Sequence, residues 1–92
     1  MASLEETWER HAQDIVKNNI AGLMGDITPM AMPKVMTLAT NPIRATSYEV
    51  KPLGDDEVEI TYVGDSKRVF WSKWQDTGSR WQIVDVVERP AG

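Results

Sequence analysis

The sequence has few side chains that could act as acids or bases, and His11 is the most conspicuous of them. It is the only histidine in the chain, and it precedes Asp14 by about one turn of a helix. A histidine beside a carboxylate can serve as a general base near neutral pH. The sequence favours the simpler interpretation, in which His11 lies at the edge of an apolar helix face with its ring solvated or hydrogen-bonded. One histidine and no cysteine exclude a histidine-rich or thiolate metal site, and no cofactor is expected.

Two further polar residues interrupt apolar segments. Asn19 falls near the middle of an apolar helix face, where a buried amide must find hydrogen-bond partners or face a polar cavity. Asp85 has apolar neighbours, so it is the best candidate for an acid with a raised pKa, although Arg68 on the neighbouring strand could neutralise it. The chain contains no glycine-rich phosphate loop and no nucleophile elbow. No catalytic residue is therefore predicted.

The amino-terminal segment predicts a long helix. Ser3 and Glu6 have the spacing of a capping box, in which each side chain accepts a hydrogen bond from the backbone of the other residue. Apolar residues at steps of three, four and seven then continue one helical face to about Leu23. We therefore expect a single helix from Ser3 to about Leu23.

A second, shorter helix is predicted after the sequence "MGDITP". Gly25 can adopt positive φ and end the first helix, and Thr28 can cap the next one. Pro29 suits the first position of a helix, where no backbone N–H is needed. The helix is expected from about Pro29 to Leu38, with a bent or loose first turn because Pro33 removes an early hydrogen bond.

The remaining sequence changes to a period of two, which is typical of strands. The turns "LGDD", "GDS" and "DTGS" are too short for parallel connections, so neighbouring strands must be antiparallel. The predicted fold class is α+β: one domain over residues 1–92, with two N-terminal helices packed on one face of a four-stranded antiparallel meander sheet. The strands are predicted at 43–51, 57–63, 67–75 and 80–88.

Alternation along the strands assigns side chains to two faces once hairpin registers are assumed. If Trp74 pairs with Trp81, the face covered by helices carries Val58, Ile60, Tyr62, Val69, Trp71, Val84 and Val86. The outer face then carries an aromatic patch of Phe70, Trp74, Trp81 and Ile83. Such a patch exceeds the apolar area that monomers usually expose, so it is predicted to form a homodimer interface. A three-residue hairpin or a β-bulge would exchange the partners of Trp81.

The first hairpin leaves two registers open. A three-residue "GDD" loop places Tyr48 and Val50 on the helix side of the sheet, whereas a two-residue loop reverses them.

Composition and charge argue against nucleic-acid binding, secretion and membrane association. The chain has 14 acidic and 10 basic residues, and its net charge of -4 repels nucleic acid and anionic membranes. The amino terminus is charged where a signal peptide has an apolar run, and no apolar segment is long enough to span a bilayer. The sequence therefore predicts a soluble, cytoplasmic protein that does not associate with membranes.

Two segments resemble one known superfamily. The segment "WERHAQDIVKNNIAGLMGDITP" is similar to the opening helix of nuclear-transport-factor-two-like proteins, and "RVFWSKWQDTGSRWQIVDVVE" is similar to their closing hairpin. This superfamily has a cystatin-like α+β fold and includes SnoaL-like and ketosteroid-isomerase-like proteins. The resemblance covers about half of the chain. It implies a pocket between helices and sheet, which is expected to be shallow or closed here because members of the superfamily are usually longer. No catalytic residue of the isomerase-like members has a match.

The predicted function is non-enzymatic: binding of a small hydrophobic ligand or a protein partner, with dimerisation through the aromatic face. The candidate pocket residues are His11, Asn19, Tyr48, Tyr62 and Trp71. The alternative is a small SnoaL-like enzyme acting on a hydrophobic cyclic substrate, with Asp85, Asp14 or His11 as the base. The third and least favoured interpretation is a platform for single-stranded nucleic acid, because "SKRVFWSKW" combines basic and aromatic residues.

Overall fold

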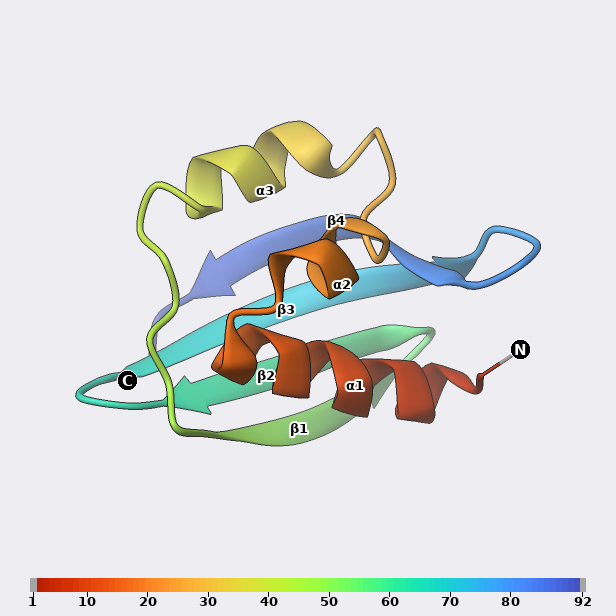
Figure 1. The fold of residues 1–92 in the computed structure, drawn as a ribbon. Coiled ribbons are helices and arrows are strands. Elements are labelled where there is room, and N and C mark those ends of the chain that lie inside the picture. Colours follow the sequence, from red (N-terminus) through yellow and green to blue (C-terminus); the bar gives the residue numbers. More distant parts are fainter. Residues whose placement is uncertain (1, 92) are drawn as a thin grey trace.

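The computed structural model describes residues 2–91 and confirms the α+β class. Within these residues the chain forms three helices and then a four-stranded antiparallel sheet in the order β1-β2-β3-β4 (Figure 1). The elements are α1 Leu4–Lys17, α2 Ile20–Met24, α3 Met32–Leu38, β1 Ser47–Gly54, β2 Glu57–Val63, β3 Lys67–Asp76 and β4 Trp81–Arg89. No helix in the described part of the chain is long and apolar enough to cross a membrane.

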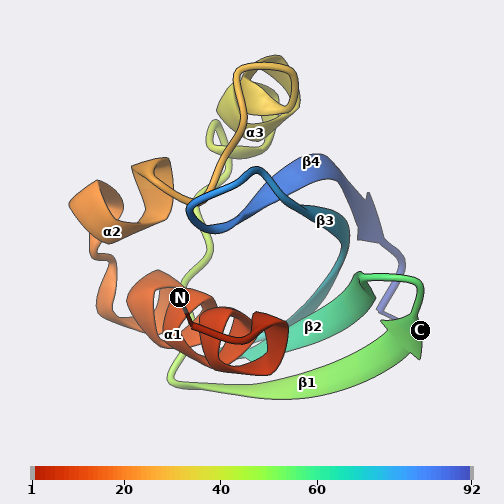
Figure 2. The same ribbon diagram turned by 90° about the vertical axis from the view of Figure 1, so that its right-hand side faces the viewer.

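The sheet is strongly curved, and α1 and α2 lie on its concave side (Figure 2). Helix α1 lies over β1 and β2, α3 lies beside the β4 edge, and α2 lies between them at the open side of the curve (Figures 1 and 2). The sheet and helices thus surround a common interior from three sides.

The predicted first helix is two helices, because the chain breaks at two asparagines. The capping box of Ser3 and Glu6 is confirmed at the start of α1. Asn18 then adopts the left-handed conformation with φ 58°, which ends α1. The Asn19 side chain accepts a hydrogen bond from the Gly22 N–H and so caps α2. Asparagine tolerates the left-handed region and caps helices well, and both properties outweigh the apolar periodicity that predicts continuation to Leu23.

Helix α3 begins at Met32, later than the predicted Pro29. The hydroxyl of Thr28 donates to the carbonyl of Ile83 on β4, which ties residue 28 to the sheet. Pro33 consequently falls in the first turn of α3, where a missing N–H removes no helical hydrogen bond. The first turn of the predicted helix, residues 29–31, is accordingly a turn that precedes α3.

The first hairpin combines features of both predicted registers. Its turn holds two residues, Asp55 and Asp56, and both have positive φ. The register also shifts between Pro52 and Gly54, which marks a bulge. Because of this extra residue, Tyr48 still pairs with Tyr62 on the helix side of the sheet.

The predicted faces of β3 are wrong, because the turn between β2 and β3 contains an additional residue. Val63 pairs with Lys67, so the turn holds the three residues 64–66, and Ile60 lies opposite Phe70. At the other hairpin Trp74 pairs with Ile83, not with Trp81, and the register shifts between Lys73 and Trp74. Side chains predicted to be inside, such as Trp71, therefore lie outside.

The predicted dimer patch is in fact part of the core. Trp74 is 1% exposed, and Phe70 and Ile83 are also buried, while Trp81 is half-buried and packs against the same cluster. The remaining buried hydrophobic residues are Leu4, Trp8, Ala12, Ile27, Ala31, Val58, Ile60 and Tyr62. One chain thus covers its own aromatic residues, and the reason for expecting a homodimer through this patch disappears.

Candidate functional site

The concave side of the sheet holds a pocket of about 1000 Å³. Its walls come from α1, α2, α3, the segment 39–46 that joins α3 to β1, and the inner face of β2, β3 and β4. A cavity of this size reaches the upper end of the range for small-molecule sites. The pocket is therefore not closed.

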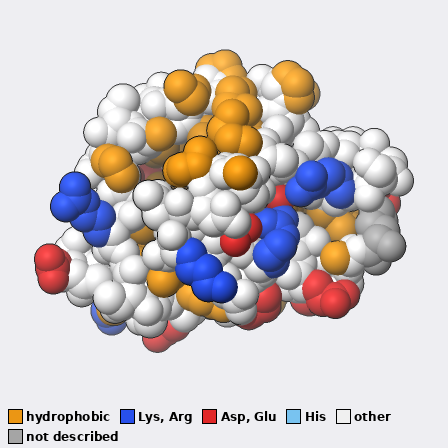
Figure 3. All heavy atoms as spheres, viewed as in Figure 1, with side chains coloured by type: hydrophobic (Ala, Val, Ile, Leu, Met, Phe, Trp, Pro, Cys, Tyr) orange, Lys and Arg blue, Asp and Glu red, His pale blue; other side chains and the backbone are white. Residues whose placement is uncertain are grey.

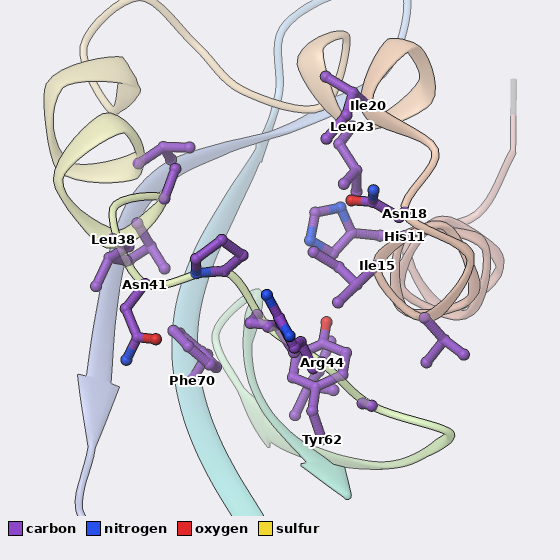
Figure 4. Close-up of a pocket in the computed structure, with 18 of the residues that line it drawn as sticks. His11, Ile15, Asn18, Ile20, Leu23, Leu38, Asn41, Arg44, Tyr62 and Phe70 are labelled. Atoms are coloured by element: carbon purple, nitrogen blue, oxygen red, sulfur yellow. The ribbon is translucent and has the colours of Figure 1, made fainter. Parts of the chain in front are cut away.

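Most of the pocket wall is apolar. Ile15 and Leu23 line it from the helices, and Ile60, Phe70 and Ile83 line it from the sheet. The polar side chains at the wall are few, and those labelled in Figure 4 are His11, Asn18, Asn41, Arg44 and Tyr62. A mainly apolar wall with a few polar groups is the usual composition of a site for a small organic ligand.

His11 is the titratable side chain that projects from α1 into this pocket (Figure 4). Its Nδ1 lies 2.8 Å from a carboxylate oxygen of Asp26. The ring packs edge-on against Trp74, with centroids 5.3 Å apart and planes at 87°. These two contacts hold the imidazole, so its orientation in the pocket is set by the fold.

Asp26 is the residue that organises the site, and its carboxylate is fully buried, with a side-chain exposure of 0%. Besides His11, it accepts hydrogen bonds from Arg10 and from Arg80, the latter at 3.0 Å. Arg10 also bridges to Asp14 at 2.7 Å. The backbone around Asp26 is fixed as well, because its carbonyl accepts the Ile83 N–H of β4 at 2.7 Å.

The charges around Asp26 keep its carboxylate ionised. Burial by itself raises the pKa of Asp26, but the hydrogen bonds from His11 and Arg10 and the positive charge of Arg10 outweigh burial, so the pKa lies below its ordinary value. Across the pocket, burial raises the pKa of the Tyr62 hydroxyl well above its ordinary value, so this group stays neutral.

Sequence reasoning missed Asp26, because "GD" in "MGDITP" indicates only a turn. The sequence offers one indication of a buried carboxylate: Asp26 lies beside the apolar Ile27, in the segment between the two predicted helices. Its partners come from α1 and from the segment just before β4, so no local motif connects them.

The predicted pocket residues are only partly brought together. His11 and Tyr62 line the pocket. Asn19 caps α2 and donates to Asp14, and the Tyr48 hydroxyl donates to Glu9 at 2.6 Å on the surface. Trp71 lies on the outer face of the sheet, where its indole N–H donates to Glu57.

The other predicted acid, Asp85, lies outside the pocket. It is partly exposed and forms an ion pair with Lys34, and this hydrogen bond lowers its pKa. The prediction of a raised pKa is therefore wrong. The predicted partner, Arg68, pairs with Glu88 at 2.8 Å instead.

The basic and aromatic segment of β3 does not form a stacking platform for nucleic acid. Phe70 and Trp74 point into the core. Of the neighbouring basic residues, Arg68 pairs with Glu88, and Nζ of Lys73 lies 3.7 Å from a carboxylate oxygen of Glu57. Only Trp71 remains on the outer face, against the guanidinium of Arg89 at 5.4 Å.

No protein family, curated protein or solved structure matches this chain. No group of three or more potential metal-ligating side chains occurs within residues 2–91. Function is therefore inferred from the geometry of the pocket.

Proposed function

We propose that this protein binds a small hydrophobic molecule in the pocket between the helices and the concave face of the sheet. The observation that carries the proposal is a cavity of about 1000 Å³ in a chain of 92 residues. A small domain has little apolar surface with which to form a core. Leaving a large apolar cavity unfilled costs stability, and binding a ligand there recovers part of that free energy.

The rim of the pocket also supports binding of an apolar molecule. Ile20, Met24 and Met36 line the pocket and are all about half-exposed or more. Hydrophobic side chains form a continuous stripe over the face that carries α2 and α3 (Figure 3). Flexible methionine side chains adapt to ligands of different shape. An apolar molecule would therefore meet an apolar surface before it enters the pocket.

The polar side chains at the pocket wall indicate which hydrogen-bonding groups a ligand would have. His11 and Tyr62 lie on the elements that form the deeper walls, and Arg44 lies on the exposed segment 39–46. A ligand with an apolar body and one or two hydrogen-bonding groups matches this arrangement. We also propose that the chain has the cystatin-like architecture of the nuclear-transport-factor-two-like proteins, and the helices and curved sheet around one pocket support this proposal.

Binding is tested by titration with an anilinonaphthalene sulfonate dye and a panel of apolar ketones, sterols and fatty acids. We expect dye fluorescence to rise and the panel members that fit to displace the dye. Ala45→Phe places a ring at the pocket wall and is expected to weaken binding by about tenfold or more. Thr61→Phe adds the same ring on the outer face, beside Val69, and is the matched control.

Two results would reject the proposal. One is the absence of any binding by the folded wild-type chain. The other is equal loss of dye binding in Ala45→Phe and Thr61→Phe, because the dye would then bind somewhere other than the pocket.

A further inference from the structure

We infer that the ligand of this pocket is an amphipathic carboxylate, an apolar molecule that ends in one carboxylate group, and that Arg44 binds this group where the pocket opens. The inference rests on the proposed function, because the apolar part of the ligand must occupy the pocket. Three observations carry it: the guanidinium of Arg44 has no acidic partner in the described chain, its backbone is held in place, and it is exposed beside an apolar wall.

Arg44 differs from the other arginines in its lack of an ion pair. Each of the others, Arg10, Arg68, Arg80 and Arg89, pairs with a carboxylate. Within residues 2–91, Arg44 forms neither an ion pair nor a side-chain hydrogen bond. A guanidinium can donate two parallel N–H groups to one carboxylate, and such bidentate pairs are among the stronger hydrogen bonds in proteins. Arg44 can therefore bind the carboxylate of another molecule without breaking a contact of its own.

The backbone of Arg44 is held on both sides by hydrogen bonds to the sheet. On one side, the guanidinium of Arg68 donates to the carbonyl oxygens of Asn41 and Pro42, at 2.9 and 3.2 Å. On the other side, the Thr46 N–H donates to a carbonyl at the end of β2, at 2.9 Å. The segment that carries Arg44 is thus tied to β3 and to β2 before any ligand binds.

Gly64 brings the chain that follows β2 against the same backbone. A Cβ atom at residue 64 would lie 2.3 Å from the carbonyl oxygen of Arg44, which is closer than such atoms approach in proteins. Only glycine therefore permits this contact. Because the backbone of Arg44 is already positioned, binding a ligand orders little more than its side chain, and the entropy cost of binding is reduced.

Arg44 lies where the pocket opens to solvent, since it is exposed and also lines the pocket (Figure 4). Its neighbours Ile43 and Ala45 belong to the same wall and pack against the core. A carboxylate bound to Arg44 keeps part of its hydration while the apolar body of the ligand lies inside. This arrangement avoids the large cost of burying an ionised group away from water.

Two other side chains at the pocket wall can carry charge near neutral pH, His11 and Asp65. Nδ1 of His11 already contacts the Asp26 carboxylate at 2.8 Å. Asp65 is exposed, so solvent screens its charge. The net charge of -4 disfavours every anion at long range. Selective binding of a carboxylate consequently depends on Arg44.

The test uses three pyrene compounds with the same apolar body and different end groups: pyrenebutyrate, pyrenebutanol and pyrenebutylamine. The Kd of each is measured at neutral pH by fluorescence polarisation with the whole chain. We expect pyrenebutyrate to bind about tenfold more tightly than pyrenebutanol, because hydrogen bonds between charged groups are the stronger ones. Pyrenebutylamine should bind most weakly of the three.

Arg44→Gln removes the positive charge but keeps a polar side chain of similar reach. We expect it to weaken pyrenebutyrate binding about tenfold and to leave pyrenebutanol binding unchanged, which also shows that the variant is folded. Arg89→Gln is the matched control, because Arg89 pairs with Glu59 and contacts Trp71 on the outer face of the sheet. This control should change the Kd of pyrenebutyrate by less than about twofold.

Failure of this inference is distinguishable from failure of the binding proposal. The inference is overturned, and the binding proposal stands, if the wild-type chain binds pyrenebutyrate no more tightly than pyrenebutanol. Equal effects of Arg44→Gln and Arg89→Gln on pyrenebutyrate, or equal effects of Arg44→Gln on both probes, also overturn it. Tightest binding of pyrenebutylamine would assign the charge recognition to Asp65 instead. If neither a pyrene probe nor the dye binds, both proposals fall.

Discussion

Trp71 and Trp74 lie three residues apart in β3, and alternation along the strand sends them to opposite faces of the sheet. Trp74 is fully enclosed and donates its indole N–H to Ser72, whereas Trp71 is half-buried on the outer face. We expect Trp74→Ala to lower the free energy of unfolding by about 3 to 5 kcal/mol. Trp71→Ala should cost about 1 kcal/mol, from lost contacts with Glu57 and Arg89. Urea unfolding of both variants checks this, and equal losses would contradict the assigned faces.

Asp26 makes stability depend on pH in a direction that can be worked out. Its pKa is lower in the folded chain than the ordinary value of 3.8, so ionised Asp26 stabilises the fold at neutral pH. That contribution is complete above the unfolded pKa and is lost as the pH falls through the folded pKa. Asp26→Asn should cost about 2 kcal/mol at neutral pH, because the partly exposed Arg10 and Arg80 recover some hydration.

The same variant supplies the measurement for that pH dependence. As the pH falls below about 5, the wild-type free energy of unfolding should fall more steeply than that of Asp26→Asn, so the two curves converge in acid. Curves that stay parallel over this range would show that Asp26 is not held ionised by its neighbours.

At the scale of elements, the junction between α1 and α2 depends on the left-handed backbone of Asn18. Asn18→Gly keeps this conformation accessible, whereas Asn18→Ala places a Cβ where it is strained. We expect Asn18→Ala to lower the free energy of unfolding by about 1 kcal/mol and Asn18→Gly to change it by less than half of that. Thermal unfolding of the pair gives the comparison, and a glycine variant that is the less stable of the two would argue against the assigned backbone.

The sequence predicts those elements that depend on near neighbours in the chain. Ser3 and Glu6 locate the start of α1, and β2 runs over the predicted residues. The interruption between α1 and α2 at Asn18 also depends on near neighbours, but the apolar periodicity continues across it and so predicts a single helix. Strand registers depend on one inserted residue in a turn or bulge, and each insertion exchanges the two faces of a strand. For this reason the aromatic residues of β3 were assigned to the wrong sides.

In the candidate site, too, the sequence does not predict contacts between residues that are far apart in the chain. His11 is identifiable by its chemistry and by its place at the edge of a helix face. Asp26 and Arg80 join it from segments 15 and 69 residues away along the sequence, and nothing in the local pattern of either one indicates the contact. These charges meet because the segment 25–28, which follows α2, is hydrogen-bonded to the start of β4.

Across the whole molecule, stability is expected to be uneven. Helix α1 contributes six buried residues, whereas α3 contributes no buried residue and lies against β4 through partly buried side chains such as Val35. We expect amide hydrogen exchange to be fastest in α2 and α3 and slowest in β2 and β3, because local opening follows the amount of buried contact. A pocket ligand should slow exchange in α3. Uniform protection of α1 and α3 without ligand would contradict this picture.

The irregular first hairpin has a consequence for behaviour at high concentration. Strand β1 forms one open edge of the sheet, where backbone groups could pair with another copy of the chain. Pro52 has no N–H to offer such a copy, the bulge beside it disturbs the ladder, and Glu49 and Lys51 place charges along the exposed strand. The edge of the sheet is therefore poorly suited to strand addition, which protects the folded chain against growth into fibrils.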